Sequence, residues 1–143
     1  YESIEKMVIE KKKPFMGICV GMQLLAEKSY EFGECEGFGW IPGEVIKLDA
    51  LDDCKIPHMG WNEIISQKHV LFNDILQGTD FYFVHSYYFK TKTADHCIAT
   101  TSYPNSITAA VCKENIFGTQ FHPEKSHKSG KKIIDNFLKW ETI

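Results

Sequence analysis

The alternation of apolar and polar residues divides the chain into a first helix, a strand that turns into a second helix, several short strands and a last helix. Ile4, Met7 and Val8 share one face of the first predicted helix, and charged residues occupy its other faces. Three consecutive lysines followed by Pro14 end it. Because this pattern opens at Tyr1 without an initiator Met, we expect the chain to be the interior of a longer protein.

The middle of the chain is typical of short strands. The apolar run at 14–19 predicts a buried strand, and residues 20–28 have the composition of a helix directly after it. Turn-forming residues gather at 32–39. Six strand-like segments follow, at 44–48, 56–65, 81–84, 97–101, 107–112 and 118–121, and apolar residues at 130–140 share one helical face. Helices at the ends with strands between them predict a three-layer α/β domain whose central sheet is mixed.

The length of 143 residues favours a single domain spanning 1–143. The composition, 43% hydrophobic and 24% charged, is that of a globular protein and excludes intrinsic disorder. Neither a membrane-spanning run nor a signal peptide is visible, so we expect a cytoplasmic protein with no membrane partner. A formal net charge of −3 argues against a nucleic-acid partner.

The basic residues and the cysteines narrow the possible chemistry. All sixteen basic residues are Lys, so an anion would have to be held by ammonium groups, backbone amides or helix ends. The five cysteines, an odd number with no C-x-x-C pair, predict neither a disulfide framework nor a zinc site, and we expect no metal or cofactor. They are Cys19, Cys35, Cys54, Cys97 and Cys112.

The segment Gly17-Ile18-Cys19-Val20-Gly21 matches the nucleophile-elbow motif, with Cys in place of Ser. We expect its two glycines to allow a tight turn between strand and helix, which would expose the Cys19 sulfur. The amino end of the following helix would favour the thiolate and lower the pKa of Cys19. A buried structural cysteine in a glycine-rich turn is the alternative for this pentapeptide alone.

A cysteine nucleophile needs a base, and His122 is the best candidate because it follows a predicted strand and precedes Pro123, which restricts the backbone. Glu124 lies close enough in sequence to orient the imidazole, as the third member of a catalytic triad does. The other histidines without such a setting are predicted to be ordinary: His58, His69, His96 and His127.

The residues at 17–25 and 120–126 together resemble the class I (triad) glutamine amidotransferase family. Within it, the segments 58–62, 82–87 and 108–111 resemble the glutaminases of imidazole glycerol phosphate synthases in histidine biosynthesis. The resemblance covers residues 14–137 and implies the three-layer class I glutaminase fold. It also implies that the chain hydrolyses L-glutamine and passes ammonia to a cyclase subunit of the TIM-barrel type, as a heterodimer making imidazole glycerol phosphate and AICAR.

The resemblance assigns a role to each triad residue. Cys19 would attack the glutamine carboxamide to form a γ-glutamyl thioester, His122 would pass the proton to the departing ammonia, and Glu124 would orient His122. Water would then release glutamate.

Further residues are implied to bind the substrate. Gln23, Glu31, Ser86 and Tyr87 would line the glutamine pocket, with Glu31 on the substrate ammonium and backbone groups around His85 and Ser86 on its carboxylate. A solvated helix face is the alternative for Gln23 and Glu31.

In the resembled family, the positions of Trp61, Tyr82 and Lys125 face the cyclase partner. An exposed Trp and Tyr beside a Lys are typical of the centre of an interface. The alternative is that Trp61 and Tyr82 belong to the core and that Lys125 is simply solvated.

One family feature has no counterpart in the sequence. Family members begin with further strand and helix units that carry a Pro-Gly-Val-Gly-type loop, which supplies one backbone N–H to the oxyanion hole. Here only the Val20 N–H is expected to serve, and losing one donor typically costs about 10²–10³ in rate. The sequence therefore also allows an inactive, amino-terminally truncated binding subunit, or a glutaminase that feeds another acceptor such as a sugar nucleotide.

Overall fold

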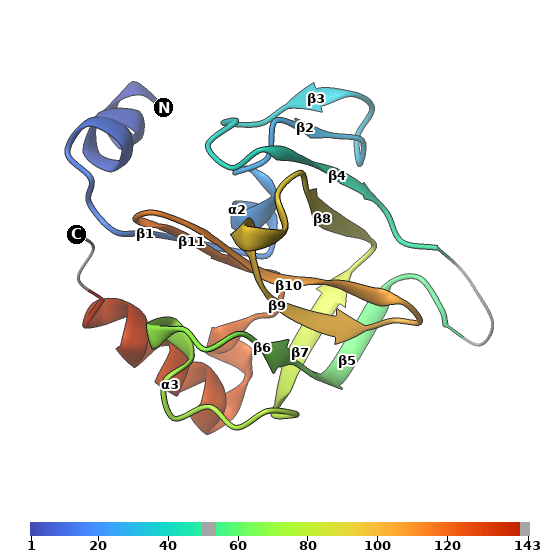
Figure 1. The fold of residues 1–143 in the computed structure, drawn as a ribbon. Helices are drawn as coiled ribbons and strands as arrows, with labels where there is room; N and C mark the ends of the chain where they lie inside the picture. The colour runs from blue at the N-terminus through green and yellow to red at the C-terminus, as the bar shows by residue number, and fades with distance from the viewer. Residues whose placement is uncertain (50–53, 141–143) are drawn as a thin grey trace.

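The computed structural model describes residues 1–49 and 54–140 (Figure 1). The chain begins with α1 (Glu2–Glu5) and the π-helix η1 (Lys6–Glu10), followed by β1 (Phe15–Ile18) and α2 (Val20–Gln23). The remaining strands are β2 (Lys28–Ser29), β3 (Cys35–Glu36), β4 (Gly43–Lys47), β5 (His58–Glu63), β6 (Ile65–Ser66), β7 (Asp80–His85), β8 (Tyr87–Thr91), β9 (Cys97–Ser102), β10 (Ser106–Lys113) and β11 (Ile116–Thr119). The other helices are η2 (Val70–Phe72), η3 (Ala94–His96), η4 (Pro123–Lys125) and α3 (His127–Leu138).

The central sheet is mixed, which confirms the prediction. Its strand order is β1-β11-β10-β9-β6. Strands β1 and β11 pair in parallel, and the other pairs are antiparallel. Because two parallel neighbours end at the same edge of a sheet, the residues that follow β1 and β11 are brought close together.

The remaining strands form two smaller sheets. One has the order β3-β2-β4-β8, and the other is the two-stranded ribbon of β5 and β7. In that ribbon His58 pairs with His85, and Trp61 pairs with Tyr82. Side chains two residues apart on a strand share a face, so His58 lies on the opposite face of β5 from Trp61, three residues away.

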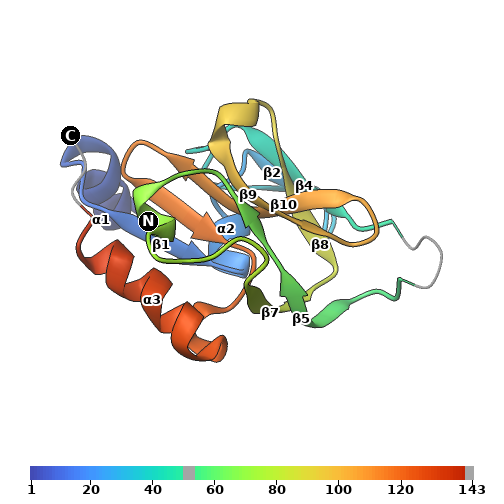
Figure 2. The same cartoon turned by 60° about the horizontal axis from the view of Figure 1, so that its bottom comes forward.

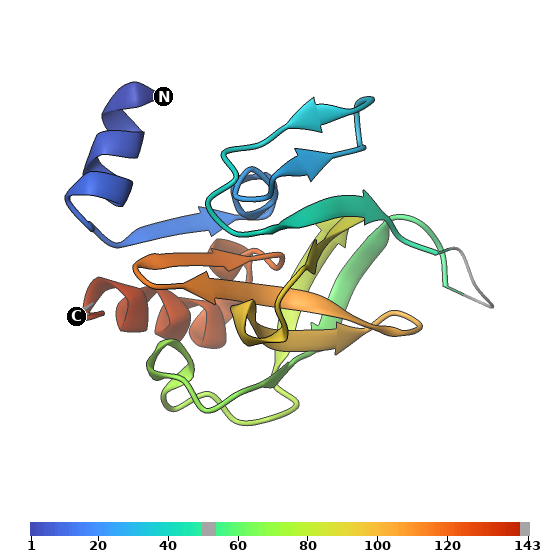
Figure 3. The same cartoon turned by 45° about the horizontal axis from the view of Figure 1, so that its top comes forward.

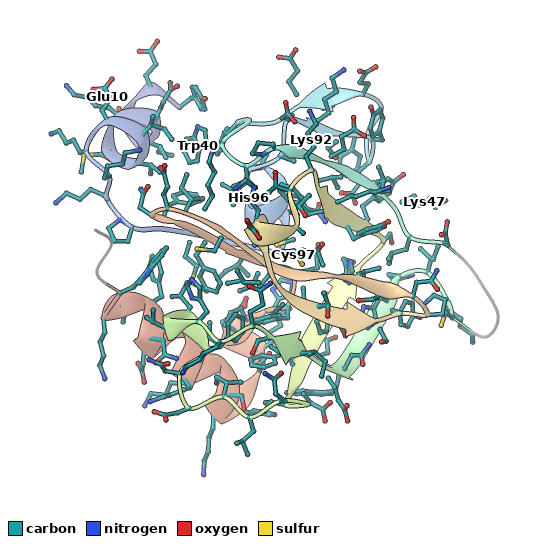
Figure 4. All side chains as sticks on the ribbon, viewed as in Figure 1. Glu10, Trp40, Lys47, Lys92, His96 and Cys97 are labelled. Carbon is teal, nitrogen blue, oxygen red and sulfur yellow. The ribbon has the colours of Figure 1, made fainter. Side chains whose placement is uncertain are left out.

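Two hydrophobic clusters, one on each face of the central sheet, give the predicted three layers. Ile133 and Trp140 of the carboxyl-terminal region pack with Phe117 and Phe121 on one face, where α3 runs along the sheet (Figure 2). On the other face Val8 packs with the residues around α2, and the amino-terminal helix and second sheet lie on this side (Figure 3). Trp40 belongs to this second cluster and lies toward the amino-terminal helix (Figure 4).

The helix predicted at 20–28 is wrong in length, because α2 ends at Gln23. The carbonyl groups that would continue it are taken by a loop distant in sequence. Phe38 N–H donates to Leu24 at 2.7 Å, and Ile41 N–H donates to Leu25 at 3.0 Å. Residues 28–29 then pair as β2 instead of extending the helix. Tertiary hydrogen bonds therefore override the local helix propensity.

Other boundaries also differ from the sequence patterns. The strand predicted at 118–121 lies at Ile116–Thr119, where it pairs with β1 from Phe15 onward. The strand predicted at 56–65 divides into β5 and β6, and β8 was not predicted. The last helix begins at His127 rather than at residue 130, because its first turn is polar and carries no apolar signal. Among the described residues, no helix is both long and apolar enough to cross a bilayer.

Candidate active site

Cys19 lies at a strained turn between β1 and α2. Its backbone adopts φ 54° and ψ −106°, a region that L-residues rarely enter. The Cys19 N–H continues the parallel ladder by donating to the Thr119 carbonyl at 2.7 Å, so the turn begins directly at the sheet edge. This geometry is that of the predicted nucleophile elbow.

The two glycines of the motif contribute unequally. A Cβ at Gly17 would lie 2.4 Å from the Gly21 carbonyl oxygen and 2.9 Å from the Met22 nitrogen, so no side chain fits there. A Cβ at Gly21 would meet no described atom within 4 Å. The expectation that both glycines are needed to avoid clashes is therefore wrong for Gly21 within the described residues.

The Cys19 sulfur is surrounded by backbone and amide groups. The thiol donates to the Val84 carbonyl at 3.8 Å, and Gln120 Nε2 donates to Sγ at 3.7 Å. Burial raises the pKa of Cys19, whereas the hydrogen bonds from the Val20 amide and Gln120 act in the opposite direction. The negative charges of Glu31 and Glu124 also raise it.

The prediction of a lowered Cys19 pKa is therefore wrong for this conformation. Burial outweighs the amide of the four-residue helix α2. The sulfur is held as a neutral thiol, and a nearby base is needed to ionise it.

His122 provides a base with a defined tautomer. Its Nδ1 lies 3.1 Å from Glu124 Oε2, and because a carboxylate oxygen only accepts, Nδ1 carries the proton. The other ring nitrogen, Nε2, is then an acceptor. It is buried and has no hydrogen-bond partner among residues 1–49 and 54–140. The imidazole is thus ready to take a proton from a group that enters the site.

Backbone contacts hold this corner in place. His122 follows the end of β11 just as Cys19 follows the end of β1, and the two strands are parallel neighbours. The His122 N–H donates to the Tyr82 carbonyl at 2.9 Å. Ser126 Oγ donates to the His122 carbonyl at 2.7 Å and accepts from the Tyr82 N–H at 3.0 Å. Strand β7 is therefore tied to the His122 backbone both directly and through Ser126.

Gln23 is buried, so the alternative of a solvated helix face is wrong for it. Its Nε2 donates to the Tyr87 carbonyl at 3.1 Å and to Gln120 Oε1 at 3.2 Å. Glu31 is half-buried, and its negative charge contributes to the raised pKa of Cys19. Ser86 lies in the bend between β7 and β8, where its carbonyl accepts from the Leu48 N–H at 2.9 Å.

His58 and His85 form a buried pair that the sequence did not reveal. His58 of β5 and His85 of β7 are paired neighbours on the two strands, and His58 Nδ1 lies 2.9 Å from His85 Nε2. The pKa of each imidazole is lowered to about 4, mainly by burial. A nearby histidine contributes to the lowering, His85 for His58 and His122 for His85, whereas the hydrogen bond with the Tyr87 carbonyl opposes it at His85. His58 was predicted to be ordinary. The pair follows from the register of β5 and β7, and the sequence pattern does not contain that register.

The three residues predicted to face a partner gather at one place. The rings of Trp61 and Tyr82 are 6.0 Å apart, and Lys125 Nζ lies 6.0 Å from the centre of the Tyr82 ring. Trp61 is 48% exposed and stacks on His127 at 5.2 Å. It is therefore not a core residue, contrary to the alternative, and it borders a cavity of about 780 Å³ at the start of α3.

The acidic, histidine and cysteine side chains of the site do not form a ligand set for a metal ion. In the described parts of the chain, no three His, Cys, Asp or Glu side chains lie together as metal ligands would. The expectation of a reaction without a metal or cofactor stays a prediction.

Comparison with known proteins identifies the family of the chain. A family model described as "Glutamine amidotransferase class-I" matches residues 2–140. The imidazole glycerol phosphate synthase subunit HisH 1 of Campylobacter jejuni (strain RM1221) is 48% identical, in a match that covers 96% of this chain and 69% of that protein. The subunit HisH of Pelagibacter ubique (strain HTCC1062) is 49% identical, with 96% and 67% covered. The chain thus spans about two thirds of the length of these relatives.

Two solved structures share the fold at lower identity. A putative GMP synthase subunit from Thermoplasma acidophilum is 23% identical with a TM-score of 0.69, over 96% of this chain and 62% of that chain. A glutamine amidotransferase from Thermotoga maritima is 17% identical with a TM-score of 0.64, over 96% and 52%. The chain spans less than two thirds of either structure. On the family match and the close relatives, the chain belongs to the class I glutamine amidotransferases.

Proposed function

We propose that this chain is the glutaminase subunit of an imidazole glycerol phosphate synthase, which hydrolyses L-glutamine to glutamate and ammonia. The observation that carries the proposal is the placement of Cys19 and His122 after the ends of two parallel neighbouring strands, with Glu124 fixing the tautomer of His122. A strained cysteine and an oriented imidazole that follow neighbouring parallel strands are the parts of a nucleophile and its base.

The reaction follows from the protonation states of these groups. His122 Nε2 accepts the thiol proton of Cys19, and the thiolate attacks the carboxamide carbon of glutamine. The oxygen gains negative charge in the tetrahedral intermediate, and the Val20 N–H donates to it. When the carbon–nitrogen bond breaks, His122 returns the proton to the leaving nitrogen, which departs as ammonia. A water molecule then loses a proton to His122 and attacks the thioester carbon. The carbon–sulfur bond breaks, glutamate leaves, and His122 returns the proton to the Cys19 sulfur.

The pocket residues divide the recognition of glutamine between them. Glu31 is half-buried and acidic, which suits the substrate α-ammonium. Gln23 donates both of its described hydrogen bonds to the protein, so its Oε1 is left to accept from substrate. The chain has no Arg, so backbone groups around His85 and Ser86, with Tyr87 beside them, would hold the substrate carboxylate.

The partner in this proposal is a cyclase subunit with a TIM-barrel fold, bound as a heterodimer in the cytoplasm. Two features support it: the relatives are named as HisH subunits of a synthase, and Trp61, Tyr82 and Lys125 form one cluster, in which Trp61 and Lys125 are exposed and Tyr82 is half-buried. The cluster is continuous with the site, because Tyr82 binds the His122 backbone. Docking there would place the partner beside the leaving ammonia.

Measurement of glutamine hydrolysis tests the chemistry. Cys19→Ser in the full-length protein is expected to abolish ammonia release, whereas Cys35→Ser is the matched control. Cys35 is exposed and lies in β3. Equal loss in both variants, or full activity of Cys19→Ser, would refute the role of Cys19.

Binding to the cyclase tests the partner. Trp61→Ala and Lys125→Ala are expected to weaken cyclase binding or partner-stimulated turnover while leaving Cys19 reactive toward a glutamine-analogue diazo ketone. If both variants bind and respond to the cyclase as the parent does, the chain serves another acceptor or docks through another face. If the parent protein carries no glutaminase activity with the cyclase present, the chain is a binding subunit only.

A further inference from the structure

A continuous line of hydrogen bonds begins at Asn62 in β5. Asn62 Nδ2 lies 3.1 Å from His58 Nε2 and also donates to the Ser102 carbonyl at 2.9 Å. His58 Nδ1 lies 2.9 Å from His85 Nε2, and His85 Nδ1 lies 2.8 Å from the Tyr87 carbonyl.

The Tyr87 carbonyl determines which ring nitrogens carry protons. A carbonyl oxygen only accepts, so His85 Nδ1 must carry a proton, and in the neutral ring Nε2 is then an acceptor. His58 Nδ1 must therefore donate to it, which leaves His58 Nε2 to accept from Asn62. Both rings are neutral in this arrangement, in agreement with the pKa of about 4 of each ring, which burial lowers more than any other cause.

The same carbonyl continues the line toward Cys19. It also accepts from Gln23 Nε2 at 3.1 Å, and this amide donates in turn to Gln120 Oε1 at 3.2 Å. Gln120 Nε2 then points at Cys19 Sγ, 3.7 Å away.

The orientation of each amide is fixed by its neighbours. If Gln120 alone were reversed, its NH₂ group would face the NH₂ group of Gln23. If Gln23 were reversed as well, its oxygen would face the Tyr87 carbonyl. Both pairings are repulsive, so the backbone oxygen sets the direction of the whole line.

Burial makes these hydrogen bonds costly to lose. His58 is 3% exposed and Gln120 is fully buried. In such an environment a polar group that loses its partner has no water to replace it, and the folded state is destabilised. Each member therefore restricts the next one more strongly than it would at the surface.

We propose that His58 is a positioning residue for the nucleophile, acting through His85, the Tyr87 carbonyl and Gln23 to hold Gln120 as a hydrogen-bond donor to the Cys19 sulfur. This inference deepens the proposed glutaminase function and rests on it for its biological meaning. Its physical content is the reactivity of the Cys19 thiol, which can be measured without glutamine. Trp61 also lies in β5, so this line of hydrogen bonds connects the ribbon that is predicted to face the partner with the Cys19 sulfur.

Alkylation of Cys19 by iodoacetamide, followed across pH in the full-length protein and mapped by mass spectrometry, tests the proposal. The charged groups that act on the sulfur are Glu31 and Glu124, and the titratable imidazole of His122 follows the neighbouring strand; all three stay unchanged in these variants. Gln120→Met removes the donor while keeping most of the volume. We expect its alkylation profile to move to higher pH and its rate at pH 7 to fall at least about tenfold, because a hydrogen bond to a charged group is stronger than one between neutral groups.

Two variants of nearly equal size separate the role of the His58 donor from its packing. His58→Asn places an amide near the former Nδ1 position, whereas His58→Leu has the same shape without a donor. Both lose the stacking of His58 on Tyr103. We expect alkylation to be roughly twofold to fivefold slower in His58→Leu, as for one ordinary hydrogen bond, and to recover in His58→Asn. His96→Leu is the control, since His96 lies in η3 next to Cys97 and outside this line (Figure 4).

Each outcome decides the matter. An unchanged profile in Gln120→Met refutes the donor to sulfur, and equal rates in His58→Leu, His58→Asn and His96→Leu refute the relay from His58. If His58→Leu does not fold, Asn62→Leu removes the first donor at a half-buried position, and an unchanged alkylation rate there overturns the relay instead. If these shifts occur in a protein that does not hydrolyse glutamine, the proposed function fails while the positioning of the sulfur stands.

Discussion

Replacement of Gly17 by Ala is expected to disrupt the nucleophile elbow. The added methyl group would lie 2.4 Å from the Gly21 oxygen, 2.6 Å from the Gly21 carbonyl carbon and 2.9 Å from the Met22 nitrogen. All three contacts are with backbone at the start of α2, so no side-chain rotation can relieve them. Either β1 or the start of α2 has to move.

The required movement sets the size of the effect. Ordinary contacts of a methyl carbon begin near 3.4 Å, so the backbone has to separate by about 1.0 Å (3.4 minus 2.4). Overpacking of a rigid interior typically costs 1–3 kcal/mol, and we expect a loss of about 3 kcal/mol in the free energy of unfolding. The same shift would displace Cys19, so its alkylation would change as well.

Gly21→Ala is the matched control. A Cβ there meets no described atom within 4 Å, and the position is helical. We expect it to raise the free energy of unfolding by about 0.5–1 kcal/mol, because Ala restricts the unfolded chain more than Gly does. Urea unfolding of both variants in this chain measures the difference. A Gly17→Ala variant as stable and as reactive at Cys19 as the parent would refute the reasoning.

Two further outcomes follow from buried polar groups. Asn115→Ala removes the amide that donates to the Val8 carbonyl at 2.8 Å and to the Lys13 carbonyl at 2.7 Å. Urea unfolding should show that the free energy of unfolding falls by about 2–3 kcal/mol, and a fall below about 0.5 kcal/mol would contradict this. His58 and His85 bind protons less readily in the folded chain (pKa about 4) than when unfolded (about 6.5), so the free energy of unfolding should fall as the pH drops from 6.5 to 4. The fall should be shallower in His58→Leu, and equal slopes would show that His58 does not contribute.

The elbow was predictable because its signal is local. A cysteine between two glycines, after an apolar run and before helix-forming residues, gave the strand, the turn and the helix start in the right order. The proximity of Glu124 to His122 was also local, because only Pro123 lies between them at the start of η4.

Features that depend on distant segments were not predictable. The length of α2 is set by hydrogen bonds from the loop at 38–41, and no pattern within residues 20–28 reports them. The His58–His85 pair depends on the register of β5 and β7. The raised pKa of Cys19 depends on how deeply the folded chain buries its sulfur, which composition and spacing do not contain.

The most direct test of the account is to trap the covalent intermediate. Full-length protein supplied with isotopically labelled glutamine and the cyclase partner would be quenched in acid, digested and analysed by mass spectrometry. The account predicts a γ-glutamyl group on the peptide that contains Cys19, and none on that peptide in Cys19→Ser. Glutamine hydrolysis with the glutamyl group on another cysteine, or with Cys19 unmodified throughout turnover, would contradict it.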